Sequence, residues 1–159
     1  MSEATVNRDE AVTKIRATIE DRAKLMATML KHMQAAGVAD AETTAASAAY
    51  ELGQMDGKNL QDVKTAGELA HRLFTPITQD VFDAQIVEDA EDRAVVHIHH
   101  CPLVVGWRTA GLDANQVNDI CNLANTRDSG LASELPLNMG FSTRIAAGDG
   151  HCTFVITKK

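Results

Sequence analysis

Apolar residues in the first part of the chain recur at the spacing of an α-helix. Over residues 6–36 they lie three or four positions apart, which is the period of one helix face, and Gly37 follows as a helix-ending glycine. The predicted helix is longer than a small domain needs to cover one sheet. We therefore predict that residues 1–37 form a long helix that joins copies of the chain in a homo-oligomer.

Two shorter helices are predicted next. Residues 41–52 are rich in alanine, and Gly53 and Gly57 are expected to break this second helix. A third helix is predicted from residue 59 to about residue 74, with Pro76 as its stop, because proline cannot continue a helix. The first half of the chain is therefore predicted to be helical.

Alternating apolar and polar residues then predict strands. Residues 81–88 and 93–101 alternate around a short acidic turn, so we expect a β-hairpin. Residues 93–101 are apolar on both faces, which predicts a central strand covered on each side. An apolar segment over residues 103–107 is expected to lead out of this strand.

The remaining pattern predicts one more helix and a second hairpin. Asp113 and Gln116 have the spacing of a capping box, which opens a helix through residue 124. A polar loop is expected over residues 125–136. Strands at 139–146 and 151–157 follow, joined by a glycine-rich turn. We predict an α+β fold in which N-terminal helices pack with a four-stranded antiparallel sheet, made of two hairpins with the further helix between them, in a single domain over residues 1–159.

Composition and charge exclude several classes of function. The net charge is −7, whereas nucleic-acid binding needs a basic surface. The chain has no apolar run long enough to span a membrane and begins without a signal-peptide pattern. Its three cysteines are widely spaced and odd in number, which favours free thiols over a disulfide framework. We expect a cytoplasmic protein that acts on a small molecule without a cofactor.

The segment from His97 to Cys101 concentrates the most reactive side chains of the chain. On a strand, His97, His99 and Cys101 line one face, since side chains alternate. Cys101 is then a candidate nucleophile with imidazoles nearby, or a small buried apolar residue at a strand end. The alternative is a metal site formed by His97, His99 and Cys101 together with His151.

Several other residues are candidates for the same site. Cys121 lies on the apolar face of its predicted helix, and Cys152 lies on the core face of the last strand, so both are expected to point toward the sheet. Arg144 stands in the middle of a predicted strand and can hold a carboxylate with two hydrogen bonds. Asn125 and Asp128 supply an amide and a carboxylate just after the predicted helix.

The order of short motifs in the second half resembles the L-2-amino-thiazoline-4-carboxylic acid hydrolase-like family. The resemblance covers roughly residues 60–157. One departure concerns the acidic residue that commonly follows the central cysteine, since the nearest acid after Cys121 is Asp128. The motifs are Cys101-Pro102, Trp107, Gly111-Leu112, Val117-Asn-Asp-Ile-Cys121, the segment with Asp128, and Gly148-Asp149-Gly-His-Cys152-Thr-Phe154.

This resemblance implies a hydrolase that opens a small cyclic amidine or thiazoline-like ring at a carbon–nitrogen or carbon–sulfur bond. It implies Cys101 as the nucleophile, His99 as the acid or base, and Asp128 as a base or orienting group. The substrate pocket would be formed by Cys121, Asn125, Arg144, Cys152 and Trp107.

Two other classes of function remain open at this point. The outline of helices and an antiparallel sheet is also similar to 4-vinyl-reductase-type domains, which favours a module that binds a small molecule or a metal. The chain would then use the histidines before Cys101 as ligands. An inactive assembly subunit is the third possibility, because of the acid missing directly after Cys121.

Overall fold

The computed structural model describes residues 7–159, so the predicted helix start at Val6 lies outside the described residues. Within this range, six α-helices and one short 3-10 turn accompany a four-stranded antiparallel sheet, and the predicted α+β class is confirmed. In chain order, the elements are α1 (Arg8–Ala35), α2 (Ala41–Lys58), α3 (Ala66–Leu73), α4 (Pro76–Phe82), β1 (Ala84–Asp89), β2 (Arg93–Ile98), α5 (Pro102–Thr109), α6 (Ala114–Ser133), β3 (Leu137–Thr143), η1 (Ile145–Ala147) and β4 (Cys152–Lys158).

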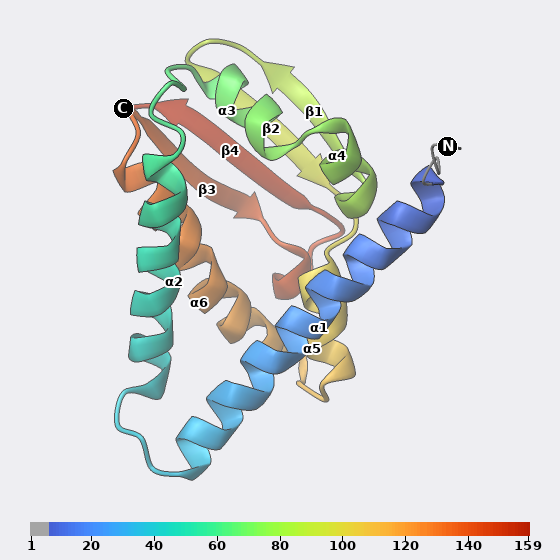
Figure 1. Ribbon diagram of the computed structural model, residues 1–159, viewed down its shortest axis with the longest axis vertical. Coiled ribbons are helices and arrows are strands. Elements are labelled where there is room, and N and C mark those ends of the chain that lie inside the picture. Colours follow the sequence, from blue (N-terminus) through green and yellow to red (C-terminus); the bar gives the residue numbers. More distant parts are fainter. Residues whose placement is uncertain (1–6) are drawn as a thin grey trace, which may run out of the picture.

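The sheet has the strand order β1-β2-β4-β3, with every neighbouring pair antiparallel (Figure 1). The two predicted hairpins are therefore present, and their inner strands β2 and β4 pair with each other. Their ladder runs from Arg93 opposite Thr157 to Ile98 opposite Cys152. This pairing places the end of the first hairpin beside the start of the last strand, which is where the candidate residues meet.

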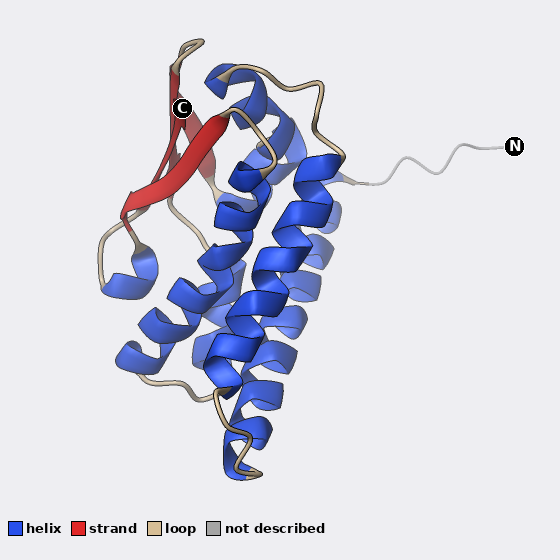
Figure 2. Ribbon diagram, turned by 90° about the vertical axis from the view of Figure 1, so that its left-hand side faces the viewer, coloured by secondary structure: helices blue, strands red, loops and turns tan. Residues whose placement is uncertain are grey.

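Within residues 7–159, helices cover one face of the sheet and leave the other open (Figure 2). Val96 and Phe154 point to this inner face and are buried against α3 and α6 in the larger core cluster. The other face carries His97, Thr153 and Val155, and Figure 2 shows no α-helix over it. The prediction that β2 is covered on both sides is therefore wrong. In the sequence, the open face of β2 reads as apolar because of Val95. This residue is buried although no described helix lies over that face.

The second helix does not break at its glycines. α2 continues through Gly53 and Gly57 to Lys58, and both glycines are buried against α6. A Cβ atom on Gly53 would lie 1.9 Å from the backbone oxygen of Arg127, and one on Gly130 would lie 2.0 Å from that of Tyr50. These glycines allow two helix backbones to touch, and this contact outweighs their low helix propensity.

The predicted third helix is shorter and is followed by a fourth. α3 begins only at Ala66, where Thr65 and Glu68 form a capping box. Pro76 does not end a helix. It is the first residue of α4, a position at which the backbone N–H has no partner within the helix, so proline costs no hydrogen bond there. α4 extends through Phe82, so the first strand starts at Ala84, later than predicted.

The segments after β2 were also predicted wrongly. β2 ends at Ile98, before the expected end at residue 101, and the expected apolar segment at 103–107 is the helix α5. The capping box of Asp113 and Gln116 is confirmed, with both reciprocal hydrogen bonds at 2.9 Å. However, α6 runs on to Ser133, so the predicted loop at 125–136 is mostly helix. Packing against α2 stabilises these polar turns.

α1 and α2 form two arms that meet at their connecting turn and spread apart toward the sheet (Figure 1). α1 packs on α5, with Ala23 buried against Gly106, while α2 packs on α6. Leu25 and Met29 stay exposed on α1. The homo-oligomer built on this helix remains a prediction. No helix within residues 7–159 has the length and apolar character needed to cross a membrane.

Candidate active site

The residues from His99 to Cys101 do not continue the alternation of strand β2. After Ile98 the chain bends, and the backbone N–H groups of His99 and His100 donate to the carbonyls of Asp83 and Phe82 at 3.1 and 3.0 Å. Cys101 then becomes the residue before the first turn of α5. The bend therefore sends the histidines and the cysteine of this motif into different surroundings.

Cys101 lies at the N-terminus of α5 in largely buried surroundings. Burial raises the pKa of its thiol to about 11, although the backbone N–H groups of Val104 and Leu103 act in the opposite direction. A helix N-terminus normally favours a thiolate, and here the loss of solvation outweighs it. At neutral pH Cys101 is a protonated thiol.

The other two cysteines lie close to Cys101. Each of their thiols further raises the pKa of Cys101. Cys152 accepts a hydrogen bond from the backbone N–H of Ile145 at 3.3 Å, and Cys121 accepts one from the Asn125 amide at 3.8 Å. Burial raises the pKa of both thiols as well. Cys121 and Cys152 were expected from the sequence to point toward the sheet, and in the structure both lie near Cys101.

Arg144 brings a positive charge to two of the thiols, Cys121 and Cys152. Its guanidinium donates to the side-chain oxygen of Asn122 on α6. The same guanidinium lies near Cys121 and lowers the pKa of that thiol, against the larger effect of burial. Its backbone N–H donates to the Asp149 carboxylate at 2.7 Å, which fixes the turn after β3. Arg144 precedes η1 and is half-buried, in place of the mid-strand position predicted for it.

Asp128 completes this group on α6. Cys121, Asn125 and Asp128 follow one another at four and three residues, so they form a stripe along one helix face. Burial raises the pKa of the Asp128 carboxyl to about 6, while the neighbouring Arg127 guanidinium lowers it. A carboxyl with this pKa exchanges protons near neutral pH. We call Cys101, Cys121, Cys152, Asn125, Asp128 and Arg144 the thiol–arginine cluster.

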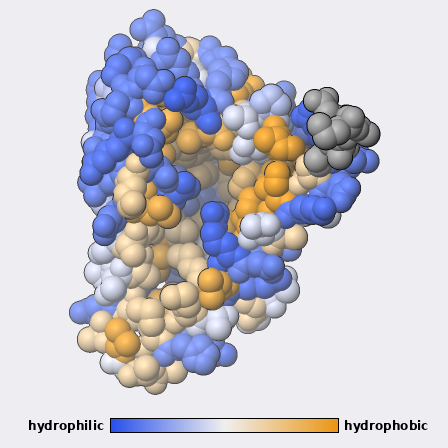
Figure 3. All heavy atoms as spheres, viewed as in Figure 1, coloured by the Kyte–Doolittle hydropathy of each residue, from blue (hydrophilic) through white to orange (hydrophobic). Residues whose placement is uncertain are grey.

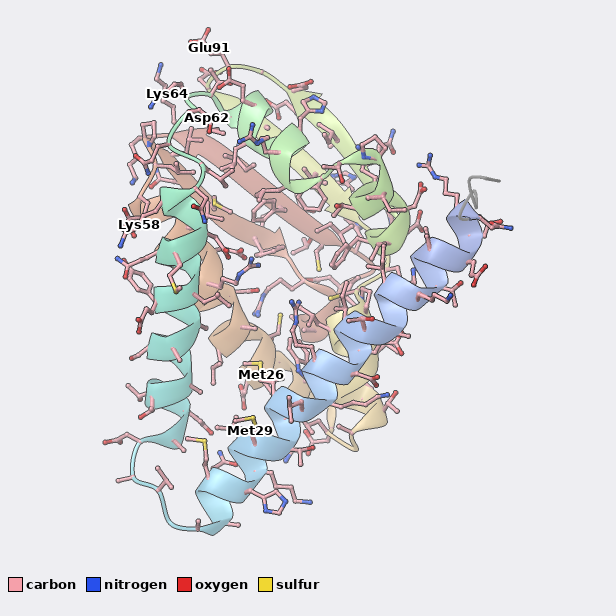
Figure 4. The ribbon with its side chains drawn as sticks, in the orientation of Figure 1. Met26, Met29, Lys58, Asp62, Lys64 and Glu91 are labelled. Atoms are coloured by element: carbon pink, nitrogen blue, oxygen red, sulfur yellow. The ribbon has the colours of Figure 1, made fainter. Side chains whose placement is uncertain are left out.

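The cluster lies where α6, η1, β4 and the start of α5 meet. In Figure 1 the middle of α6 and the short turn of η1 lie between the two arms. The surface there is hollowed, and apolar residues line the α1 side of the hollow (Figure 3). Met26 and Met29 extend from α1 toward α2 on this side (Figure 4). Asn125, Asp128 and Arg144 are each only partly buried, so a small molecule can reach them.

His99 belongs to a different group of side chains. Its ring centre lies 5.3 Å from that of His151 and 6.4 Å from that of His97, on the open side of the sheet. His97, His99 and His151 are three of the four residues named for the alternative metal site, and their rings lie together, whereas Cys101 lies near the other two thiols. Within residues 7–159, no group of three or more histidine, cysteine, aspartate or glutamate side chains has the geometry of a metal centre.

Trp107 was predicted to line the pocket, and it is almost completely buried. It is 1 % exposed and packs with Val104, Val117 and Ile120 in the second core cluster. Its ring Nε1 is buried and has no hydrogen-bond partner among residues 7–159. Trp107 thus stabilises the α5–α6 corner behind the cluster.

Asn122 was assigned no role from the sequence. It holds the Arg144 guanidinium, although the two residues are 22 positions apart. No periodicity connects a helix residue with a turn residue at that distance, so only the fold shows this pair. Because a loop was predicted after residue 124, Asp128 was not placed on the same helix face as Cys121. The continuous helix α6 places it there.

Comparison with known proteins gives one family. The model of the family described as L-2-amino-thiazoline-4-carboxylic acid hydrolase matches residues 14–156. The match includes most of α1, which the sequence motifs had left outside the resemblance. Neither the curated proteins nor the solved structures gave a significant match.

Proposed function

Because this chain belongs to the L-2-amino-thiazoline-4-carboxylic acid hydrolase family, we propose that it opens a small thiazoline-like or cyclic amidine ring by hydrolysis at the thiol–arginine cluster. The observation that carries this proposal is that Asp128 and Arg144 both lie near Cys121 in the thiol–arginine cluster. They supply a proton acceptor with a pKa of about 6 and a cation suited to a substrate carboxylate.

Asp128 is assigned the proton transfers. Its carboxylate takes a proton from a water molecule, whose oxygen attacks the sp² carbon between the ring sulfur and nitrogen. The carbon–sulfur or carbon–nitrogen bond then breaks, and the departing atom receives the proton that Asp128 took. A raised carboxyl pKa suits both halves of this cycle, because the group must accept and release a proton near neutral pH.

Arg144 is assigned to the substrate carboxylate. The family description specifies a carboxylic acid, and an arginine binds such a group with two parallel hydrogen bonds. Asn122 holds the guanidinium from one side, which limits its freedom before the substrate arrives. The Asn125 amide faces Cys121 beside it and is placed to contact the ring.

Covalent attack by Cys101 is the second candidate mechanism. The N–H groups of Val104 and Leu103 point toward its sulfur, as at other helix N-termini that activate a thiol. With a thiol pKa of about 11, very little thiolate is present at neutral pH. His99, the acid or base that the resemblance implied for Cys101, lies with His97 and His151 instead. We therefore place the water mechanism first.

The experiment is a ring-opening assay with L-2-amino-thiazoline-4-carboxylic acid and the purified full chain. We expect turnover, and we expect Arg144→Ala to raise KM by about tenfold or more, since a charge-assisted hydrogen bond is lost. Arg108→Ala, at an exposed arginine of α5, is the matched control and keeps the wild-type KM. Equal KM values for the two variants would contradict the role of Arg144.

Cys101→Ala separates the two mechanisms. The water mechanism predicts that this variant keeps its turnover within about tenfold, because only a pocket wall changes. Complete loss of turnover in a folded Cys101→Ala protein would replace it with the covalent mechanism. No turnover by the wild-type chain would overturn the hydrolase proposal and favour a binding module or an inactive assembly subunit.

A further inference from the structure

Three imidazoles lie together on the open face of the sheet, away from the thiol–arginine cluster. The ring centre of His151 is 4.6 Å from that of His97 and 5.3 Å from that of His99, and the rings of His97 and His99 are 6.4 Å apart. His97 and His151 are half-buried, and His99 is exposed. We call these three residues the imidazole cluster.

The backbone holds these side chains in register. His97 lies on the open face of β2, and His99 follows directly after the strand ends at Ile98, with its ring centre 6.4 Å from that of His97. The ladder of β2 and β4 ends with Ile98 opposite Cys152, which places His99 across from His151. The Thr143 hydroxyl donates to the His151 carbonyl at 2.9 Å and ties this residue to β3. Three strands thus position the cluster.

We propose that His97, His99 and His151 bind a divalent transition metal ion such as Zn²⁺. A Zn–N bond is about 2.0–2.1 Å, so the ring centres of two imidazoles on one tetrahedral zinc lie about 5 Å apart. The three measured separations lie on either side of this value. Imidazole is a preferred ligand for zinc, copper and nickel, whereas hard cations favour oxygen ligands.

Metal binding requires the rings to turn, since their nitrogens do not surround one point in the described residues. The planes of the rings meet at 36° to 86°. A side chain moves between staggered rotamers without moving its backbone, and no helix covers this face to block it (Figure 2). Three histidine ligands leave the fourth position of the metal open to water.

This site does not depend on the proposed hydrolase activity. Cys101 lies near the other thiols and is not among the proposed ligands, in contrast to the metal site predicted from the sequence. The metal ion binds where β2 and β4 pair. It stabilises the folded chain, because a ligand that binds only the folded state raises the unfolding temperature.

The test is titration of the full chain with Zn²⁺ by isothermal calorimetry, together with thermal unfolding with and without Zn²⁺. We expect one saturable site and a higher unfolding temperature with the metal. His97→Asn, His99→Asn and His151→Asn should each weaken binding by about tenfold or more, since each removes one ligand. Circular dichroism of each variant checks that it is folded.

His32→Asn and Cys101→Ala are the matched controls. His32 is an exposed histidine on α1, and its loss should leave the affinity for Zn²⁺ unchanged. Cys101→Ala should also bind Zn²⁺ as the wild type does. Absence of saturable binding, or equal weakening by His32→Asn or Cys101→Ala, would overturn the proposal whatever the result of the ring-opening assay.

Discussion

The thiol–arginine cluster and the imidazole cluster both draw residues from two short segments, 97–101 and 151–152, but lie on different sides of the sheet. One is enclosed by α5, α6 and η1, and the other faces solvent. Burial raises the pKa values of Cys101 and Asp128. The imidazoles, in contrast, are brought together by the pairing register of β2 and β4. The contrast shows that burial, more than the identity of the residues, determines which chemistry each region can support.

The largest contrast is expected between adjacent residues of β4. Phe154 is 3 % exposed on the inner face and contacts Phe74 and Phe141, with ring centres 5.9 and 4.8 Å away. Phe154→Ala should lower the free energy of unfolding by about 4 kcal/mol. Val155→Ala, on the open face, should lower it by about 1 kcal/mol. Urea unfolding measures both, and equal losses would show that the open face is covered.

The next effect concerns the contact that supports the enclosed region. Gly130→Ala forces a Cβ atom toward the Tyr50 carbonyl, so α2 and α6 must move apart. We expect a loss of about 3 kcal/mol in urea unfolding. Gly140→Ala is the control, because no atom lies within 4 Å of its added Cβ, and it should change the stability by less than about 0.5 kcal/mol. A stable Gly130→Ala protein would contradict the close packing of these helices.

A smaller and opposite effect is expected at Asp128. Its carboxyl pKa rises from 3.8 to about 6 on folding, so the folded state binds the proton more tightly and loses stability as the pH rises through this range. Asp128→Asn removes this loss and should stabilise the chain at pH 7.5 by about 2 kcal/mol, allowing for the partial exposure of the carboxyl.

At a pH below 3.8 the gain from Asp128→Asn should disappear, because the wild-type carboxyl is then protonated in both states. Asp119→Asn, at an exposed aspartate of the same helix, is the control and should leave the stability within about 0.5 kcal/mol at both pH values. Urea unfolding at the two pH values provides the comparison. A gain that does not depend on pH would exclude burial of the charge as its cause.

The fold class could be predicted from alternation and helical spacing, but the ends of the elements could not. The low helix propensity of glycine predicts a break at Gly53 and Gly57. Their close contact with α6, which keeps the helix intact, can be seen only in the folded structure. Pro102 marks the end of a strand in the sequence and the start of α5 in the structure. Tertiary packing decides both cases, as it does for the polar second half of α6.

The candidate site was predicted only in part. The core positions of Cys121 and Cys152 follow from helix and strand periodicity, and the structure brings them to Cys101. The assignment of His99 to this group assumed that alternation continues to residue 101. The backbone hydrogen bonds to Asp83 and Phe82 end it at Ile98 instead. Such a bend depends on α4, which the sequence pattern did not reveal.

The most direct test of the proposed active site is the pH dependence of kcat/KM for ring opening. If Asp128 is the base, kcat/KM of the wild type should fall as the pH drops below about 6, and Asp128→Asn should lose about a hundredfold or more at every pH. Asp119→Asn should keep the wild-type profile. An Asp128→Asn protein with nearly wild-type kcat/KM, or a wild-type profile that is flat across pH 6, would contradict the account.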